Sequence, residues 1–343
     1  MSGKRRAIAT GRGAILAIAS TLAAVLAAML ASCASPSMPS PVPLDRVATA
    51  GETPTGGLVV EGVALDPRIE WARGDTFDWQ VEERYAGSAG DGGTTIGRVL
   101  AVETTWRVED VDTDGRATVV QSVDRVRVAD DHPARTVRFD SLAESDSERT
   151  LAAAGAGDAT VRTARDLVGA TVRFVVDRSG RISALDFPQV IERATHASRI
   201  AAVPRLFAAS GWRQALETLA YLPPRAVAPG GVWSFTEARG HALGELESEV
   251  SLAYRGRASE VEPHLDLVTF TKQAKRIPAA ARDGDLHVEA ATANGEIAFA
   301  GGRGVVFRFS QRGRMRFADG SGILPNRDVE SLVTVRLERR GAR

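Results

Sequence analysis

Val99-Leu100-Ala101-Val102-Glu103-Thr104-Thr105-Trp106-Arg107-Val108 is the stretch from which the fold of this chain can be worked out. The side chains at even-numbered positions from Leu100 to Val108 are mostly apolar, and those between them are mostly polar. A period of two indicates an antiparallel strand with one face buried and the other in water. The stretch therefore predicts a sheet with a core on one side.

Segments of the same kind lie on both sides of this one. Asp112 to Gly115 predicts a turn, after which Ala117 to Val128 returns as a second strand. Further strands are expected at 58–60, 77–81, 136–139, 172–176, 181–187, 245–254, 265–271, 286–290, 296–299, 305–310, 314–317 and 332–337. The predicted class is mainly β (α+β), as either a large curved antiparallel sheet or two half-barrel-like β repeats.

A helical segment interrupts the β pattern. Apolar residues recur at helical spacing between Val190 and Leu222, Pro188 suits a first helical position, and Pro223-Pro224 ends the segment. We expect two helices, separated at Ser210-Gly211. The body then divides into a first β unit at 58–187, a helical connector at 188–229 and a second β unit at 230–343.

The two β units share an order of landmarks. Gly74-Asp75-Thr76-Phe77 opens the first and Gly230-Gly231-Val232-Trp233 opens the second, and each unit later has an apolar-Arg-Phe strand, at Thr171–Phe174 and Val306–Phe309. This order predicts an internal duplication. The alternative is that any two antiparallel meanders look alike at this level of detail.

The N-terminus has the pattern of a targeting segment. Basic residues at 4–6 and 12 precede an apolar run from Ala14 to Leu30, which is typical of a secretory signal. The run ends in Leu30-Ala31-Ser32-Cys33, which resembles the lipobox of bacterial lipoproteins. The resemblance implies a signal peptide at 1–32, cut before a Cys33 whose thiol carries a diacylglyceryl group. The alternative is a transmembrane anchor with an incidental cysteine.

Residues 33–57 would then join a lipid to the folded body. The segment is rich in Pro, Ser, Thr and Gly and lacks the apolar surface needed for order, so we expect a flexible tether. The lipoprotein resemblance implies a place in the cell envelope, on the periplasmic side, held to a membrane by the N-terminal lipid. Ala34 replaces the Asp that retains enterobacterial lipoproteins in the inner membrane, which favours the outer membrane.

The body resembles a family of uncharacterised β-rich bacterial lipoproteins over about residues 72 to 340. The resemblance rests on Gly74-Asp75, on Asp112 to Gly115, on Phe139-Asp140-Ser141 and on Gly230 to Trp233. It implies the β-rich fold and no activity, since the family has none assigned, and it implies no site residue.

Composition excludes several classes of function. The whole chain has 43 basic and 43 acidic side chains, and removal of residues 1–32 takes away four basic ones, leaving a net charge of about −4. A weakly acidic surface does not indicate nucleic-acid binding. Cys33 is the one cysteine, so with its thiol acylated neither a disulfide nor a cysteine metal site is expected.

Motifs for catalysis are missing from the sequence. The histidines, at 132, 196, 241, 264 and 287, have no metal-ligand spacing, and neither a Gly-x-Ser-x-Gly elbow nor a phosphate-binding glycine loop is present. We expect no enzyme, no metal and no cofactor. A hydrolase assembled from distant residues is the alternative.

Two functional hypotheses follow from the predicted sheet. In the first, the protein is a non-catalytic binding module whose concave face takes a lipid or another apolar ligand. The residues expected to line this face are Trp106, Phe174, Trp233, Phe235, Phe307 and Phe309. Their alternative role is ordinary core under the helices. In the second hypothesis, the protein is a structural or protein-interaction lipoprotein of the envelope without a pocket.

Overall fold

A computed structural model describes residues 64–88, 95–132, 135–142, 159–199, 204–241, 244–258, 264–277, 286–302, 304–319 and 327–340. The predicted signal peptide, the cysteine predicted to be lipidated, the predicted tether and the predicted strand at 58–60 lie outside these residues. The described residues form one twelve-stranded sheet, in which all pairs between named strands are antiparallel.

Most strands follow predicted segments and are longer. The segments predicted at 286–290 and 296–299 form one strand, as do those at 305–310 and 314–317, and the strand at 232–241 was not predicted. The strands are β1 (Thr76–Ser88), β2 (Thr95–Val111), β3 (Ala117–His132), β4 (Arg135–Asp140), β5 (Thr171–Val176), β6 (Ile182–Asp186), β7 (Val232–His241), β8 (Gly244–Arg257), β9 (Asp266–Arg276), β10 (Leu286–Ala300), β11 (Val306–Asp319) and β12 (Arg327–Arg339).

The strand order joins the two predicted β units into one sheet. It runs β6-β5-β3-β2-β1-β12-β11-β10-β9-β8-β7, with β4 paired to β3 beside this path. β1 lies beside β12, with Trp79 opposite Leu337. Of the two predicted architectures, the single large sheet is therefore the one that forms, and separate half-barrels do not. The duplication stays a prediction, because strand pairing does not test it.

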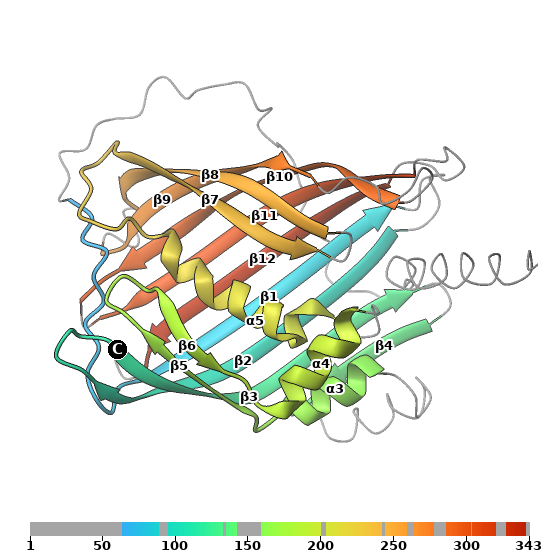
Figure 1. The fold of residues 1–343 in the computed structure, drawn as a ribbon, viewed down its shortest axis with the longest axis horizontal. Coiled ribbons are helices and arrows are strands. Elements are labelled where there is room, and N and C mark those ends of the chain that lie inside the picture. The colour runs from blue at the N-terminus through green and yellow to red at the C-terminus, as the bar shows by residue number, and fades with distance from the viewer. Residues whose placement is uncertain are drawn as a thin grey trace, which may run out of the picture.

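The helical insert lies where the sheet is open. Strand neighbours are sequence neighbours from β7 to β12, and β1 then continues the order, so the break falls between β6 and β7. The chain between these strands forms α4 (Gln189–Arg199), η1 (Arg205–Phe207), α5 (Ala209–Leu216) and η2 (Glu217–Tyr221). Figure 1 shows the sheet curving behind these helices, with α3 (Ala159–Leu167) beside α4.

The predicted helix boundary at Ser210-Gly211 is wrong, because both residues lie in the first turn of α5. The physical reason is close packing. A Cβ built on Gly211 would stand 2.1 Å from the carbonyl oxygen of Arg205 in the preceding turn η1. Glycine is needed here for the approach of two backbone segments and does not end a helix.

The core lies between the helical insert and the inner face of the sheet. Trp212 on α5 packs against Trp79 on β1 with ring centroids 6.0 Å apart, and its indole N–H donates to Gln121 on β3 at 3.1 Å. The Gln121 amide in turn donates to the Thr104 hydroxyl at 2.9 Å. This buried chain of hydrogen bonds fixes α5 on strands β2 and β3.

One end of the curved sheet is closed by the segment before β1. Leu65 and Ile69 are fully buried. Leu65 forms a bridge with Val227, and Ile69 forms one with Gly302, so the segment contacts the end of the helical connector and the connection between β10 and β11. The described residues contain no helix long and apolar enough to cross a membrane.

Candidate ligand site on the inner face of the sheet

A row of inward residues crosses the middle of the sheet under α5. Strand register places Glu83 on β1 opposite Val333 on β12, and Val333 opposite Gln311 on β11. Successive residues of a strand point to opposite faces, so partners at these positions share one face. Glu83 and Gln311 are each 8% exposed, which makes them buried polar residues on an otherwise apolar surface.

A small cavity separates this row from the helices. It is lined by Glu83, Gln214, Ala215, Thr218, Phe309, Gln311 and Val333. The volume of this cavity that is available to water is about 10 Å³, which is enough for about one water molecule. The cavity therefore lies between α5 and η2 on one side and β1, β11 and β12 on the other.

Gln311 has an unsatisfied group at this cavity. Its side-chain carbonyl oxygen, Oε1, is buried and has no hydrogen-bond partner. A buried acceptor without a donor is unfavourable, because it has lost its water and gained nothing in exchange. The Glu83 carboxylate is also an acceptor, and its Oε2 receives the Tyr85 hydroxyl at 2.9 Å. The unpaired oxygen of Gln311 therefore favours a hydrogen-bond donor in the cavity, beside the Glu83 carboxylate.

The next inward row is made of small residues. Ser331 on β12, Gly313 on β11 and Ala293 on β10 are consecutive register partners, and we call these three the small-residue floor. Tyr85 pairs with Ser331 at one side of the floor, and Lys272 pairs with Ala293 at the other. The floor thus has little side-chain bulk between two large polar residues.

The inner face becomes more exposed beyond the floor. The row after it contains Val329, Met315 and Ala291, all of them half-buried. By contrast, Phe307 and Val335, on the same strands under the helices, are no more than 1% exposed. Apolar surface therefore continues along β10, β11 and β12 past the part that the core fills.

Charged and hydroxyl groups stand beside the floor on the β1 to β3 side. Arg98 on β2 is the register partner of Tyr85 and forms an ion pair with Asp130 on β3 at 2.5 Å. Burial raises the pKa of Tyr85 well above its usual value of 10.0, and the neighbouring Glu83 raises it further, while Arg205 and Arg98 act in the opposite direction. Tyr85 is therefore a neutral donor at neutral pH.

A second polar cluster lies on the other side. Lys272 on β9 forms an ion pair with Glu237 on β7, and the Tyr221 hydroxyl donates to the same Glu237 carboxylate at 3.1 Å. The Trp233 indole N–H donates to the carbonyl oxygen of Tyr221 at 3.2 Å. These bonds hold the end of the helical insert to β7, the edge strand at the opening.

The predicted aromatic site residues fall into two groups instead of lining one pocket. Trp106 and Phe174 are fully buried and contact each other edge to face at 5.0 Å. Phe307 is fully buried as well. The structure places these three in the core under the helices, which is the alternative role that the sequence left open for them.

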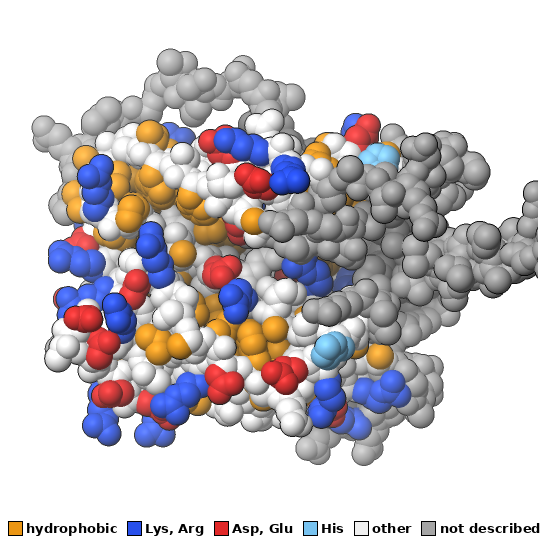
Figure 2. Space-filling model, viewed as in Figure 1, with side chains coloured by type: hydrophobic (Ala, Val, Ile, Leu, Met, Phe, Trp, Pro, Cys, Tyr) orange, Lys and Arg blue, Asp and Glu red, His pale blue; other side chains and the backbone are white. Residues whose placement is uncertain are grey.

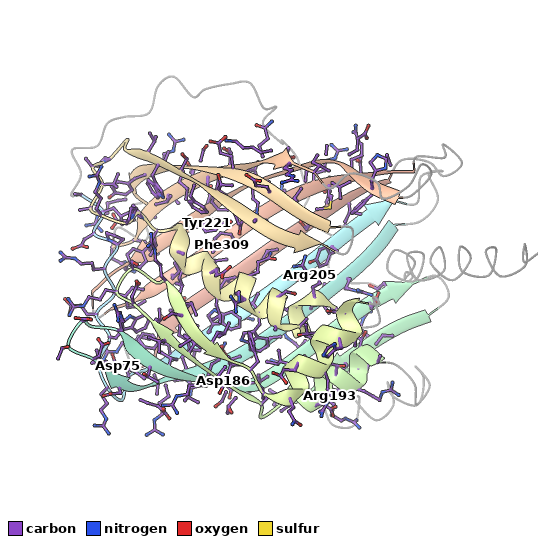
Figure 3. The ribbon with its side chains drawn as sticks, in the orientation of Figure 1. Asp75, Asp186, Arg193, Arg205, Tyr221 and Phe309 are labelled. Carbon is purple, nitrogen blue, oxygen red and sulfur yellow. The ribbon has the colours of Figure 1, made fainter. Side chains whose placement is uncertain are left out.

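The second group surrounds Tyr221. Phe235 and Phe309 each contact its ring edge to face, at 5.1 Å and 5.4 Å, and Figure 3 shows Tyr221 beside Phe309, with Arg205 nearer the other end of the insert. Phe309 also lines the cavity. Trp233 and Phe235 are half-buried on β7, where hydrophobic side chains gather on the face shown in Figure 2. A ligand role for all six residues stays a prediction.

Glu83 and Gln311 are candidate residues that sequence reasoning missed. A signal for Glu83 was present, because Phe77, Trp79 and Val81 alternate along β1 and Glu83 stands at the next inward position. A polar residue on a buried face is more informative than another apolar one. No group of three or more His, Cys, Asp or Glu residues that could hold a metal occurs in the part of the chain that the structure describes.

Comparison with known proteins assigns no family. No protein-family model and no curated protein matches the sequence. The large antiparallel sheet resembles that in a structure described as "lipid-protein interactions in lipovitellin", with 12% identity and a TM-score of 0.43. That match covers 78% of this chain and 25% of the other, so the chain spans about a quarter of the length of the lipovitellin chain.

Two further solved structures are still less similar. DynF, from the dynemicin biosynthesis pathway of Micromonospora chersina, has 7% identity and a TM-score of 0.21, over 86% of this chain and 92% of that one. A DUF3598-family protein of unknown function from Nostoc punctiforme has 9% identity and a TM-score of 0.08, over 76% and 95%. These values are too low to assign a family, and the resemblance to bacterial lipoproteins stays a prediction.

Proposed function

We propose that this chain is a lipid-anchored extracytoplasmic protein that binds an apolar ligand, without catalysis, on the inner face of its sheet. The anchor is Cys33, and the envelope location follows from the signal and lipobox pattern at 1–33. Two acyl chains on one residue provide stable membrane attachment, whereas one chain provides only reversible attachment.

The observation that supports binding is the incompletely covered inner face. The small-residue floor puts little side-chain bulk on β10, β11 and β12, and half-buried Met315 and Val329 continue the apolar surface from it. Ligand sites in proteins combine an apolar lining with a few placed polar groups, and here Tyr85 and Lys272 flank the floor. The site proposed on this basis is the floor, and the six aromatic residues support it from the core and from β7.

The test is to fill the floor. Gly313→Leu places a branched apolar side chain at its centre, and the nearest neighbour of the new Cβ is the Ser331 hydroxyl at 2.8 Å, which can rotate away. We expect the amount of lipid recovered from the purified full chain by solvent extraction and mass spectrometry to fall at least ten-fold. Ala293→Leu fills the same row from the next strand.

The matched control is Gly304→Leu. A Cβ built on Gly304 has no atom within 4 Å, so the same substitution there leaves the floor open. The proposal predicts stoichiometric lipid in the wild type and in this control. Equal lipid in all variants, or none in the wild type, would refute a binding role for the floor.

A further inference from the structure

We infer that the ligand of the floor carries a hydrogen-bond donor head, a hydroxyl or an ammonium group, which enters the cavity under α5. This inference rests on the proposed function and names the chemical class of its ligand. The acceptors would be Gln311 Oε1 and the Glu83 carboxylate. The chain of the ligand would lie over the floor toward Met315.

The unpaired carbonyl of Gln311 is the main support. Gln311 is 92% buried, lines the cavity and leaves its Oε1 without a partner. A buried polar network usually satisfies each of its members, so an orphaned acceptor at a cavity indicates a donor that enters from outside the protein. A bound water molecule would also supply a donor to Gln311. However, the row of Glu83, Val333 and Gln311 lies directly beside the small-residue floor, so a ligand on the floor lies next to the same acceptor.

The charges around the cavity favour a donor over an anion. Glu83 is the one charged residue among those lining it. Arg98, which stands beside Tyr85, is committed to Asp130 at 2.5 Å. Arg205 on η1 lowers the pKa of Tyr85 through its charge. It is not among the residues that line the cavity. A carboxylate head in the cavity would therefore lie beside the Glu83 carboxylate, and no Lys or Arg side chain lines the cavity to pair with it.

The geometry also suits an extended chain. Gln311, Gly313 and Met315 are alternate residues of β11 and point to the same face. At about 3.4 Å per residue, the row from Gln311 to Met315 spans roughly 14 Å. A linear aliphatic chain with its head at Gln311 would cross the glycine and reach the half-buried Met315.

The experiment compares three probes of one chain length: dodecylamine, dodecanol and dodecanoate. Binding to the full chain held in amphipol is measured at neutral pH by the shift in its thermal unfolding. We expect the amine and the alcohol to bind at least ten-fold more tightly than the carboxylate. Gln311→Leu should weaken the binding of dodecanol and dodecylamine at least ten-fold and leave dodecanoate binding within about two-fold, because the shape of the cavity is nearly kept while the acceptor is lost.

A second variant separates the two acceptors. Glu83→Gln should weaken dodecylamine binding about ten-fold and leave dodecanol binding within about two-fold, since it removes the charge and keeps an acceptor. Glu296→Gln, at an exposed position on β10, is its matched control and should change neither.

The outcomes distinguish the two proposals. Dodecanoate bound as tightly as the amine, or dodecanol binding that is unchanged by Gln311→Leu, would overturn the donor-head inference while leaving a binding function intact. The second of these results would mean that the cavity holds an ordered water only. Failure of all three probes to bind a folded wild-type chain would overturn the proposed function itself.

Discussion

At the scale of single residues, hydrogen bonds of buried side chains distinguish aromatic residues that otherwise look alike. Trp212 and Trp106 are both fully buried. The Trp212 indole N–H donates to Gln121, whereas the indole N–H of Trp106 has no partner. Loss of the indole should therefore have different consequences at the two positions.

Trp212→Phe should lower the free energy of unfolding by about 1–3 kcal/mol more than Trp106→Phe. Both substitutions remove the same atoms, but only the first leaves the Gln121 carbonyl buried without a donor. Urea unfolding of the two variants measures the difference. Equal losses would show that the hydrogen bond from α5 to β3 contributes nothing.

Tyr85 predicts a dependence of stability on alkaline pH. Its pKa is raised in the folded state, so the unfolded chain loses the proton first, near pH 10. The stabilisation is fully present below that pH and is lost as pH rises above it toward the folded pKa. The wild type should therefore lose stability between about pH 10 and 12, as measured by urea unfolding.

Tyr85→Phe is the comparison for this prediction. It removes the titrating hydroxyl, so its unfolding free energy should fall less steeply over the same pH range. Tyr254, whose pKa is also raised by burial and by Asp266, stays in both proteins and supplies the common background. Parallel curves for the two proteins would contradict a raised pKa of Tyr85 in the folded protein.

At the scale of elements, the helical insert depends on close backbone packing at η1 and α5. Gly211 permits it, since any Cβ there meets the Arg205 carbonyl oxygen and the Leu206 backbone. Because the neighbouring atoms belong to the backbone, they cannot rotate away as a side chain would. For this reason, the prediction that Ser210-Gly211 separates two helices is wrong.

Gly211→Ala should destabilise the protein by about 1–3 kcal/mol, despite the better helix propensity of alanine. The expected cause is displacement of α5 from η1, and thermal unfolding measures it. Gly304→Ala, with open space around its Cβ, should stay within about 0.5 kcal/mol of the wild type. A stabilised Gly211→Ala would show that α5 is not held close to η1.

At the scale of the whole molecule, one curved sheet carries its core and its candidate site on the same face. The helices cover the part near Phe307 and Val335, and the small-residue floor continues beyond them. Lys272, Glu237 and Tyr221 tie the end of the insert to the edge strand β7. The proposed ligand would lie on the half-buried part of this face, next to Met315 and Val329.

The proposed lipid anchor at Cys33 would determine whether the whole molecule is attached to a membrane. Cys33→Ala should abolish incorporation of labelled palmitate and move the protein from the membrane to the soluble fraction after signal removal. Ser37→Ala, in the predicted tether, is the matched control and should leave both unchanged. Membrane retention of a processed Cys33→Ala protein would rule out the lipoprotein interpretation.

The sequence alone determined the fold class, most strand positions and the place of the helical insert, because alternation and helical periodicity are local properties of the chain. The alternation along β1 also contained a signal for Glu83, which the sequence analysis missed. Only the tertiary structure decided that β1 pairs with β12, since residues as distant as Phe77 and Arg339 meet only when both halves bury one shared face. For the same reason, only the structure showed which aromatic residues the helices cover and where Gln311 is left without a partner.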